Sequence, residues 1–333
     1  MTDSFDSRTA VLRLLADGEQ HSGEQLAQTL GLSRAAVWKQ IRRARSYGLG
    51  VDAVRGRGYR LRQPLELLDH DQILRGLGGD LRRRVQRLDV FAELESTNSY
   101  LCGGAKAAPG QLTVCLAEYQ TGGRGRRGRS WQMPFGGGLS LSVGWLFPMQ
   151  PPDLAALALA VGVVARRVLI ERTGLAVQIK WPNDLLHGDR KLGGILVELA
   201  AESRGPCHAV IGLGINVTAT PELPPDTNAW AGGATDIAAA ANGRAPSRNA
   251  LAIGLIAGLA ALLHEYASSG FAAYRREFGH ADYLFGRSIH VAGVDGGVTG
   301  TAAGLDEAGA LIVTTGTGVI KVVSGEVGVR TPS

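Results

Sequence analysis

Apolar and polar residues recur at helical spacing through most of the first fifty positions. An apolar face predicts a helix over residues 7–17. Ser22 followed by Gln25 is a capping-box pattern, which predicts the start of a second helix over 23–30. After a glycine turn, the same spacing predicts a third helix over 34–47. Two helices joined by a tight turn are typical of a helix-turn-helix.

Two short runs with period-two alternation follow, at 51–54 and 58–61. They predict a β-hairpin with a basic tip, so we expect residues 1–65 to form a winged helix-turn-helix DNA-binding domain. The basic residues expected to contact DNA are Arg34, Lys39, Arg43, Arg55 and Arg57. A helical protein-interaction module is the alternative.

The distribution of charge favours DNA binding. Residues 1–63 hold 11 Lys and Arg against 6 Asp and Glu, whereas the other residues hold 24 of each sign. The whole net charge of +5 therefore lies in the first part of the chain. Such a local surplus is expected of a surface that contacts nucleic acid.

From about residue 88 the pattern alternates between strands and helices. Strands are predicted at 90–94, 112–118, 138–145, 177–181, 194–199 and 209–217. Helices are predicted at 65–77, 154–171 and 251–266, and a long loop with one short helix at 218–245. We therefore expect a central α/β domain over 66–283.

The last 45 residues are rich in Gly, Val, Thr and Ala and show no helical spacing. Strands are predicted at 289–292, 298–305, 310–314 and 319–323. We expect residues 284–333 to form a small β-barrel domain.

The candidate chemistry centres on residues 118–131, here called the arginine loop, in which glycines and arginines alternate. Glycine lets the backbone approach a ligand closely, and arginine matches carboxylate and phosphate oxygens. The segment therefore predicts a ligand with several anionic oxygens. An RG-rich RNA-binding tail is the alternative, but the loop lies between apolar, strand-like runs.

Further cations, Lys180 and Lys191, lie at predicted strand ends. The histidines show no metal-ligand spacing, and the sequence has neither a Ser/His/Asp ordering nor a Walker-type phosphate loop. A site that stabilises charge in this way suits the activation of a carboxylate by ATP with release of pyrophosphate. Ser96, at a strand-to-helix junction, is either a ligand-binding hydroxyl or an ordinary N-cap.

The sequence also predicts where the protein works. Three cysteines without pairing or metal spacing indicate a reducing compartment. The N-terminus has no apolar run, and the apolar stretch 154–164 is shorter than a membrane span. We expect a cytoplasmic protein without a membrane segment.

Four motifs resemble those of biotin protein ligases in order and spacing: GRGRRG at 123–128, KWPND at 180–184, KLGGIL at 191–196 and GLGIN at 212–216. ESTN at 95–98 and SGEV at 324–327 fit the same family, and residues 22–26 and 32–37 resemble its bifunctional type, a ligase and biotin operon repressor in one chain. Met133 and the triple glycine at 136–138 depart from the family pattern, which suggests local loop differences.

The resemblance implies an α+β multidomain fold: an N-terminal winged helix-turn-helix, a central α/β ligase domain with a mixed, mostly antiparallel sheet, and a C-terminal SH3-like β-barrel. It implies Lys180 and Arg126 as catalytic residues and no metal-binding residue. The biotin-binding residues it implies are Ser96, Thr97, Asn98, Gln120, Arg124, Gly125, Arg126 and Lys180. The residues it implies for ATP or adenylate are Arg127, Arg129, Lys191, Asn216 and Trp230.

The reaction implied joins biotin and ATP, with Mg²⁺, into biotinyl-5′-AMP and transfers biotin to a lysine of biotin carboxyl carrier protein. An adenylate-bound homodimer is then expected to bind operator DNA and repress biotin synthesis genes. A lipoate-type ligase is one alternative, which the fused helix-turn-helix and the arginine loop disfavour. A ligand-sensing regulator without catalysis is another, which the presence of Lys180 disfavours.

Overall fold

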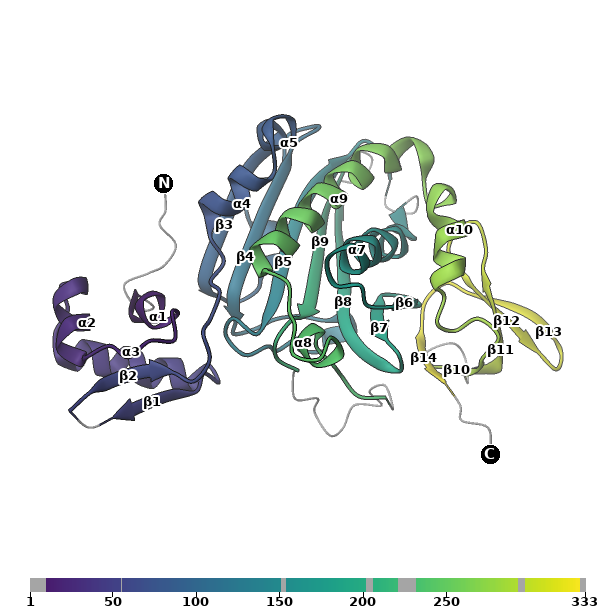
Figure 1. Ribbon diagram of the computed structural model, residues 1–333. Helices are drawn as coiled ribbons and strands as arrows, with labels where there is room; N and C mark the ends of the chain where they lie inside the picture. The colour runs from purple at the N-terminus through teal and green to yellow at the C-terminus, as the bar shows by residue number, and fades with distance from the viewer. Residues whose placement is uncertain are drawn as a thin grey trace.

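The computed structural model describes residues 10–54, 56–150, 154–201, 206–220, 232–292 and 297–329. Two predicted site residues, Arg55 and Trp230, lie outside these residues. Among the described residues the strands form three sheets, of two, seven and five strands. Figure 1 shows them in chain order, with the large sheet between the N-terminal helices and the C-terminal strands.

The N-terminal part contains the three helices and the hairpin that the sequence predicts. The elements are α1 (Ala10–Leu15), α2 (Gly23–Leu30), α3 (Arg34–Ser46), β1 (Val51–Val54) and β2 (Gly58–Leu61). The predicted capping box is present, because the Gln25 N–H donates to Ser22 Oγ and the Ser22 N–H donates to Gln25 Oε1. Gly31 ends α2 with a φ of 63°, a left-handed conformation that favours glycine.

The central sheet has the order β3-β4-β5-β9-β8-β7-β6. Its strands are β3 (Val85–Leu94), β4 (Leu112–Gln120), β5 (Gly138–Phe147), β9 (Cys207–Asn216), β8 (Arg190–Ala201), β7 (Asp184–His187) and β6 (Val177–Lys180). Only β3 and β4 pair in parallel, whereas the other neighbours pair antiparallel. The prediction of a mixed, mostly antiparallel sheet is confirmed.

Alternation along two central strands separates a core face from a polar face. In β5, Leu139, Leu141 and Val143 lie in the main core, and in β9, Ile211, Leu213 and Ile215 do so. Helices α7 (Leu157–Thr173) and α9 (Arg248–Ser269) pack against each other and against this sheet (Figure 1). The intervening residues of these strands therefore face away from the helices, because successive side chains of a strand point to opposite faces.

Helix α9 is apolar for a structural reason. By length and composition alone it could cross a membrane, yet half of its most apolar window is buried inside the protein. It also begins with an ion pair in the interior, because Arg248 lies 2.7 Å from Glu118 and both side chains are almost fully buried. The Leu68 N–H donates to the same carboxylate, so the segment that leads into the central domain is fixed there.

Five shorter helices complete the described part of the chain: α4 (His70–Gly76), α5 (Gly79–Arg84), α6 (Thr97–Gly103), α8 (Ile237–Ala240) and α10 (Ala272–Ala281). The helix predicted over 65–77 begins at His70 instead, capped by Asp69, whose side chain accepts the Gln72 N–H. Helix α8 is the short helix expected within the loop at 218–245.

The C-terminal strands form one antiparallel sheet, in the order β13-β12-β11-β10-β14. They are β10 (Ser288–Ala292), β11 (Val298–Leu305), β12 (Leu311–Thr315), β13 (Gly318–Val322) and β14 (Glu326–Val329). This sheet is held against the central domain because the Trp181 indole N–H donates to the Gly309 carbonyl at 3.1 Å. An antiparallel β domain is confirmed, whereas its closure into a barrel stays a prediction.

The N-terminal domain shares its core with the central domain. Phe135 and Ala92 are buried in the same apolar cluster as the residues of α1, α2 and α3. The Phe135 ring stacks on that of Tyr47 with centroids 5.4 Å apart, and the Phe135 N–H donates to the Tyr47 carbonyl at 3.1 Å. The C-terminal end of α3 is therefore seated on the chain that follows the arginine loop.

Candidate active site and nucleic-acid interface

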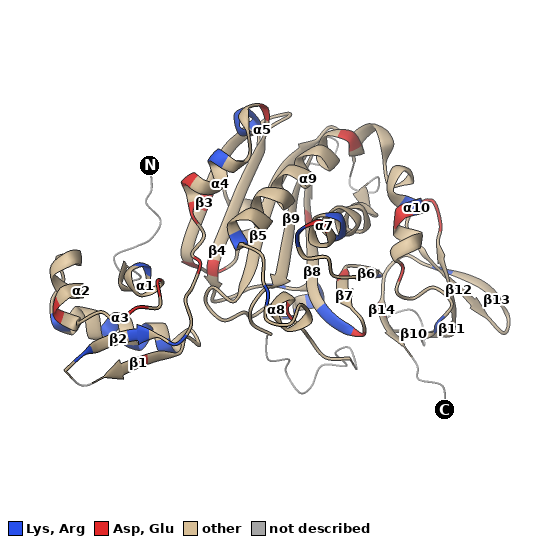
Figure 2. Cartoon of the chain, in the orientation of Figure 1, with Lys and Arg blue, Asp and Glu red and all other residues tan. Residues whose placement is uncertain are grey.

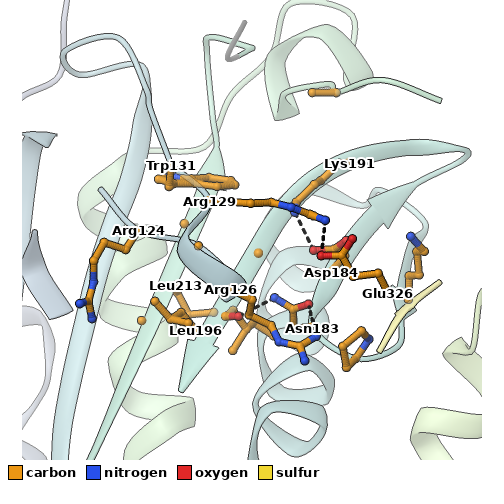
Figure 3. Close-up of a pocket in the computed structure, with 18 of the residues that line it drawn as sticks. Arg124, Arg126, Arg129, Trp131, Asn183, Asp184, Lys191, Leu196, Leu213 and Glu326 are labelled. Carbon is orange, nitrogen blue, oxygen red and sulfur yellow. Dashed lines mark hydrogen bonds and ion pairs between the residues drawn. The ribbon is translucent and has the colours of Figure 1, made fainter. Parts of the chain in front are cut away.

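A cavity of about 1050 Å³ lies on the polar face of the central sheet. Residues of the arginine loop, of the strand ends around Lys180 and of strand β14 line it together. Figure 3 shows these residues converging from separate strands and loops. The predicted residues that line it are Ser96, Thr97, Asn98, Gln120, Arg124, Gly125, Arg126, Arg129, Lys180, Lys191 and Asn216.

One end of the cavity is a network of buried hydroxyl and amide groups. Ser96 caps α6, as its ordinary N-cap interpretation requires, and it also lines the cavity. Gln120 Oε1 accepts the Thr97 N–H at 2.8 Å. The Ser142 hydroxyl lies 2.7 Å from Thr97 Oγ1 and 2.6 Å from Asn98 Oδ1. These groups fix one another's orientation, which suits a small polar ligand with donors and acceptors at defined positions.

Glycines of β9 make room for this network. A Cβ at Gly212 would lie 2.3 Å from Asn98 Oδ1, and a Cβ at Gly214 would lie 2.4 Å from Trp131 Cε2. The GLGIN motif therefore places two glycines where side chains and a ring must approach the strand closely.

The arginine loop is folded back on itself. The Gly125 N–H donates to the Arg129 carbonyl at 2.7 Å, and the Trp131 N–H donates to the Gly123 carbonyl at 2.7 Å. Within the turn, Arg127 has a φ of 56°, which is unusual for a residue with a side chain. The loop thus presents its arginines in different directions.

The four arginines have different environments. Arg124 pairs with Glu198, and Figure 3 shows its side chain extending away from Arg126. Arg126 is half-buried, donates to Asn183 Oδ1 at 3.4 Å, and has a pKa lowered by burial. Arg129 pairs with Glu326 of the C-terminal domain. Arg127 is exposed and does not line the cavity, so the structure does not bring it together with the other predicted adenylate residues.

Lys180 is the buried cation of the cavity, with 7% of its surface exposed. Burial lowers its pKa to about 8, while Asp184 acts in the opposite direction and Lys191 adds to the lowering. Burying a charged ammonium is costly. A buried lysine with a pKa lowered to near neutral pH is therefore typical of a functional site, where the charge has a use.

Lys191 and Trp131 lie together beside the buried cation. Lys191 Nζ is 2.6 Å from Asp184 Oδ1 and 5.8 Å from the centre of the Trp131 ring. Figure 3 shows the indole and the amine at the same side of the cavity. Trp131, Asp184 and Glu326 line the cavity although no role was predicted for them. For Trp131, its place at the end of the arginine loop is the signal in the sequence that could have indicated one.

Asn216 is completely buried, and its side-chain NH₂ donates to the Thr235 and Lys191 carbonyls. Two polar atoms of cavity-lining residues, Asn216 Oδ1 and Trp131 Nε1, are buried without a hydrogen-bond partner among the described residues. Such atoms usually mark a place where a ligand or water completes the hydrogen bonding.

The departures at Met133 and 136–138 also have a structural basis. Met133 is buried and its Cε would lie 2.8 Å from a Cβ at Gly138, and a Cβ at Gly136 would lie 2.4 Å from Leu65. The glycines at 136–138 therefore allow this segment to pack closely against Met133 and against Leu65, at the end of the N-terminal domain.

The basic residues of the N-terminal domain do not all share one surface. Arg34, Lys39 and Arg57 are exposed, as expected for a DNA-contacting face. Arg43 is half-buried and donates to both oxygens of Glu93 at 2.7 Å. This position does not support the prediction that Arg43 contacts DNA, because a carboxylate of the central domain holds its side chain at the interdomain contact. Figure 2 shows that α3 carries basic but no acidic residues.

Comparison with known proteins agrees with this organisation. Residues 7–60 match a family model described as an HTH domain, residues 90–216 the biotin/lipoate A/B protein ligase family, and residues 284–330 the biotin protein ligase C-terminal domain. The bifunctional ligase/repressor BirA of Escherichia coli is 38% identical over 96% of both chains. That of Bacillus subtilis is 32% identical over 94% of both.

Solved structures show the same fold. The biotin protein ligase from Aquifex aeolicus in complex with biotin and ATP has a TM-score of 0.61 and 27% identity, and covers 74% of this chain and 100% of its own. The similarity to the BirA proteins covers nearly the whole chain, and the three family models match its N-terminal, central and C-terminal parts in turn. The chain belongs to the family of bifunctional biotin protein ligases, in which a helix-turn-helix repressor domain is fused to the enzyme.

Proposed function

We propose that the cavity binds biotin and ATP together and forms biotinyl-5′-AMP. The observation that carries this proposal is Lys180, a buried ammonium in a cavity that the hydroxyl-and-amide network and the cations of the arginine loop also line. A biotin carboxylate and the α-phosphate of ATP are both anions, so a site that joins them needs cations at the point where they meet.

The polar end of the cavity suits the ureido head of biotin. Such a head offers two N–H donors and one carbonyl acceptor, and Ser96, Thr97, Asn98 and Gln120 provide hydroxyl and amide partners in a fixed arrangement. The tail then extends towards Arg126, Gly125 and Lys180. For Arg124 to contact biotin, its ion pair with Glu198 has to open.

In the first step, a carboxylate oxygen of biotin bonds to the α-phosphorus, and the bond from that phosphorus to the pyrophosphate oxygen breaks. The Lys180 ammonium and the Arg126 guanidinium stabilise the negative charge that builds up on the phosphoryl oxygens. In the second step, a lysine amine of the carrier protein attacks the acyl carbon, AMP leaves, and the amine loses a proton.

The nucleotide is proposed to lie between Trp131 and the arginine loop. The indole rests on Gly214, which leaves its other side for the adenylate. Asn216 Oδ1 and Trp131 Nε1 are the buried atoms that the nucleotide would pair, with Lys191 and Arg129 near the phosphates. Arg127 does not line the cavity, so its contact with the adenylate stays a prediction. Trp230 is kept as a candidate for packing on adenine.

Mg²⁺ is proposed to arrive with ATP. No group of three or more His, Cys, Asp or Glu side chains in the described residues could hold a metal ion. Mg²⁺ is commonly held by substrate phosphates and one or two carboxylates, and Asp184 is a carboxylate that lines this cavity. Bound Mg²⁺ would neutralise part of the phosphate charge.

The N-terminal domain is proposed to repress transcription of biotin synthesis genes in the cytoplasm. Operator DNA would contact Arg34, Lys39, Arg57 and Arg55, and an adenylate-bound homodimer would read two half-sites. We place the domain boundaries at 1–65, 66–283 and 284–333, and infer that the last closes into an SH3-like barrel. The acceptor of biotin would be a biotin carboxyl carrier protein.

Pyrophosphate release separates this function from that of a lipoate-type ligase. The full chain is incubated with ATP, Mg²⁺ and either biotin or lipoate. We expect release with biotin at least 100 times faster than with lipoate. Equal rates would contradict the assignment of the polar network to biotin. The absence of release with both would contradict the enzymatic proposal itself.

A further inference from the structure

The exposed face of α3 carries a tryptophan. Trp38 is 51% exposed, although tryptophan is among the side chains that gain most from burial. Its neighbours Val37 and Ile41 are buried in the N-terminal core, so the helix directs Trp38 outwards. A large exposed aromatic on a positioned helix is a feature of a binding surface.

Basic residues lie one helical turn before and one turn after Trp38. The Arg42 guanidinium lies over its ring, with Cζ 4.9 Å from the ring centroid, one helical turn further along. Arg34 lies one turn before it, and α3 contains no acidic residue. Among the described residues, Arg34, Lys39 and Arg42 form no ion pair, so their charges are available to a partner.

The contact between α3 and the ligase domain uses a different side of the helix. Arg43 and Tyr47 meet Glu93 there, about 140° and about 180° around the helix from Trp38 by the ordinary angle of 100° per residue. The interdomain contact therefore leaves the Trp38 face uncovered and holds it at a fixed angle to the ligase domain.

We propose that Trp38 is a specificity-determining residue for operator DNA, and that Arg42 takes the place in the DNA-contacting face that was assigned to Arg43. This inference rests on the proposed repressor function. In the major groove, the indole packs against the C5-methyl group of a thymine, which is the apolar group that a base pair presents there. Arg34, Lys39 and Arg42 contact phosphates or guanine beside it.

DNA is favoured over a protein partner because of charge. A protein surface that buried Trp38 would need acidic groups opposite three unpaired cations, whereas every DNA sequence supplies them on the backbone. The width of the major groove, about 12 Å, also accepts one α-helix with its side chains. The methyl group then distinguishes one base pair from another at the position that Trp38 reaches.

The test begins with selection of bound duplexes from a library of randomised sequence, using the full chain with biotin, ATP and Mg²⁺. Each thymine of the selected duplex is then replaced by uracil, which removes only the methyl group. We expect one replacement to weaken binding by the full chain about fivefold. Trp38→Ala should lose a similar factor with the thymine duplex and nothing further with the uracil duplex.

Two controls separate this contact from general effects. Phe285→Ala removes another exposed aromatic, 65% exposed, from a different domain and should leave DNA binding unchanged. Trp38→Ala should keep the wild-type rate of pyrophosphate release and the wild-type salt dependence of DNA binding. Arg42→Ala should reduce the slope of that salt dependence by about one, because it removes a phosphate contact.

Three results would overturn the inference. If removal of the thymine methyl group weakens binding by Trp38→Ala as much as it weakens binding by the wild type, the proposed contact with thymine is wrong, although the domain still binds DNA. If Trp38→Ala changes only the oligomeric state in sedimentation, Trp38 belongs to an interface between copies. If no duplex is enriched by the full chain, the repressor function and this inference fail together, while pyrophosphate release still tests the enzyme.

Discussion

The Arg43 guanidinium donates to both carboxylate oxygens of Glu93 at 2.7 Å, and so joins the last turn of α3 to β3. The Tyr47 hydroxyl donates to the same carboxylate, and burial together with this contact raises the pKa of Tyr47 to about 12. The phenol is therefore protonated at neutral pH. Three polar groups from two domains thus form one hydrogen-bonded cluster.

Arg43→Ala should loosen this contact without affecting catalysis. Both side chains are about a third exposed, so we expect a loss of about 1 kcal/mol, which corresponds to roughly fivefold faster amide exchange in α3. Hydrogen exchange of the intact chain measures it. Lys39→Ala, on the same helix without an ion pair, is the matched control. Equal exchange in the two variants would show that the cluster adds no stability.

Lys180→Ala should slow adenylate formation by about 100-fold or more, which corresponds to about 3 kcal/mol of lost transition-state stabilisation. The reason is that a buried ammonium acts on charge that develops during the step. Burst measurements of pyrophosphate release with biotin and ATP report the step directly. Near-normal release by the variant would remove Lys180 from the catalytic residues.

The pH dependence of the first step should reflect the same ammonium. Burial lowers the pKa of Lys180 to about 8, so the free enzyme loses this positive charge as the pH rises through 8. We expect kcat/KM for ATP to fall above pH 8, because kcat/KM reports ionisation of the free enzyme. In Lys180→Arg the guanidinium stays protonated, so the alkaline decline should disappear. A wild-type profile that is flat to pH 9.5 would contradict this assignment.

Gly214→Ala should weaken ATP binding. The added Cβ would lie 2.4 Å from Trp131 Cε2, so the indole has to leave its position on the strand. We expect KM for ATP to rise about tenfold, with a smaller effect on KM for biotin. Gly279→Ala is a suitable control, because nothing lies within 4 Å of its Cβ. An unchanged KM for ATP in Gly214→Ala would place the nucleotide elsewhere.

Glu326→Gln should release the adenylate more readily. The Arg129–Glu326 ion pair connects the arginine loop to the C-terminal domain beside the cavity. Without the negative charge the loop should open more often, and biotin should appear on lysines of an unrelated protein such as serum albumin. The measurement is biotin incorporation into that protein relative to the carrier. Strict carrier labelling by the variant would contradict a closing role for this pair.

Local signals explain what the sequence could predict. β1 and β2 were predicted with the observed bounds, as was α2, because caps, turns and alternation lie within a few residues of each element. The cations around Lys180 could also be predicted, since each lies near one end of a predicted strand. β7 could not, because its four residues are fixed by pairing with β6 and β8.

The features that could not be predicted depend on contacts between residues that are far apart in the sequence. The side of α3 that meets the ligase domain depends on Glu93, fifty positions after Arg43 in the chain. The role of Trp131 depends on Gly214, which neither spacing nor composition connects to it. The link between the C-terminal domain and the arginine loop depends on β14, which brings Glu326 to Arg129.

The packing of α3 against Phe135 affects any version of this enzyme that lacks the N-terminal domain. A ligase that begins after residue 65 would expose Phe135 and Ala92 to solvent, and Tyr119 beside them would lose the ring of Tyr47. Such a fragment would tend to self-associate through this exposed apolar patch. Low solubility, rather than loss of catalytic activity, would therefore limit its use. Free-standing ligases cut from this chain would therefore need polar substitutions at these positions, and Phe135→Ser is the first to try.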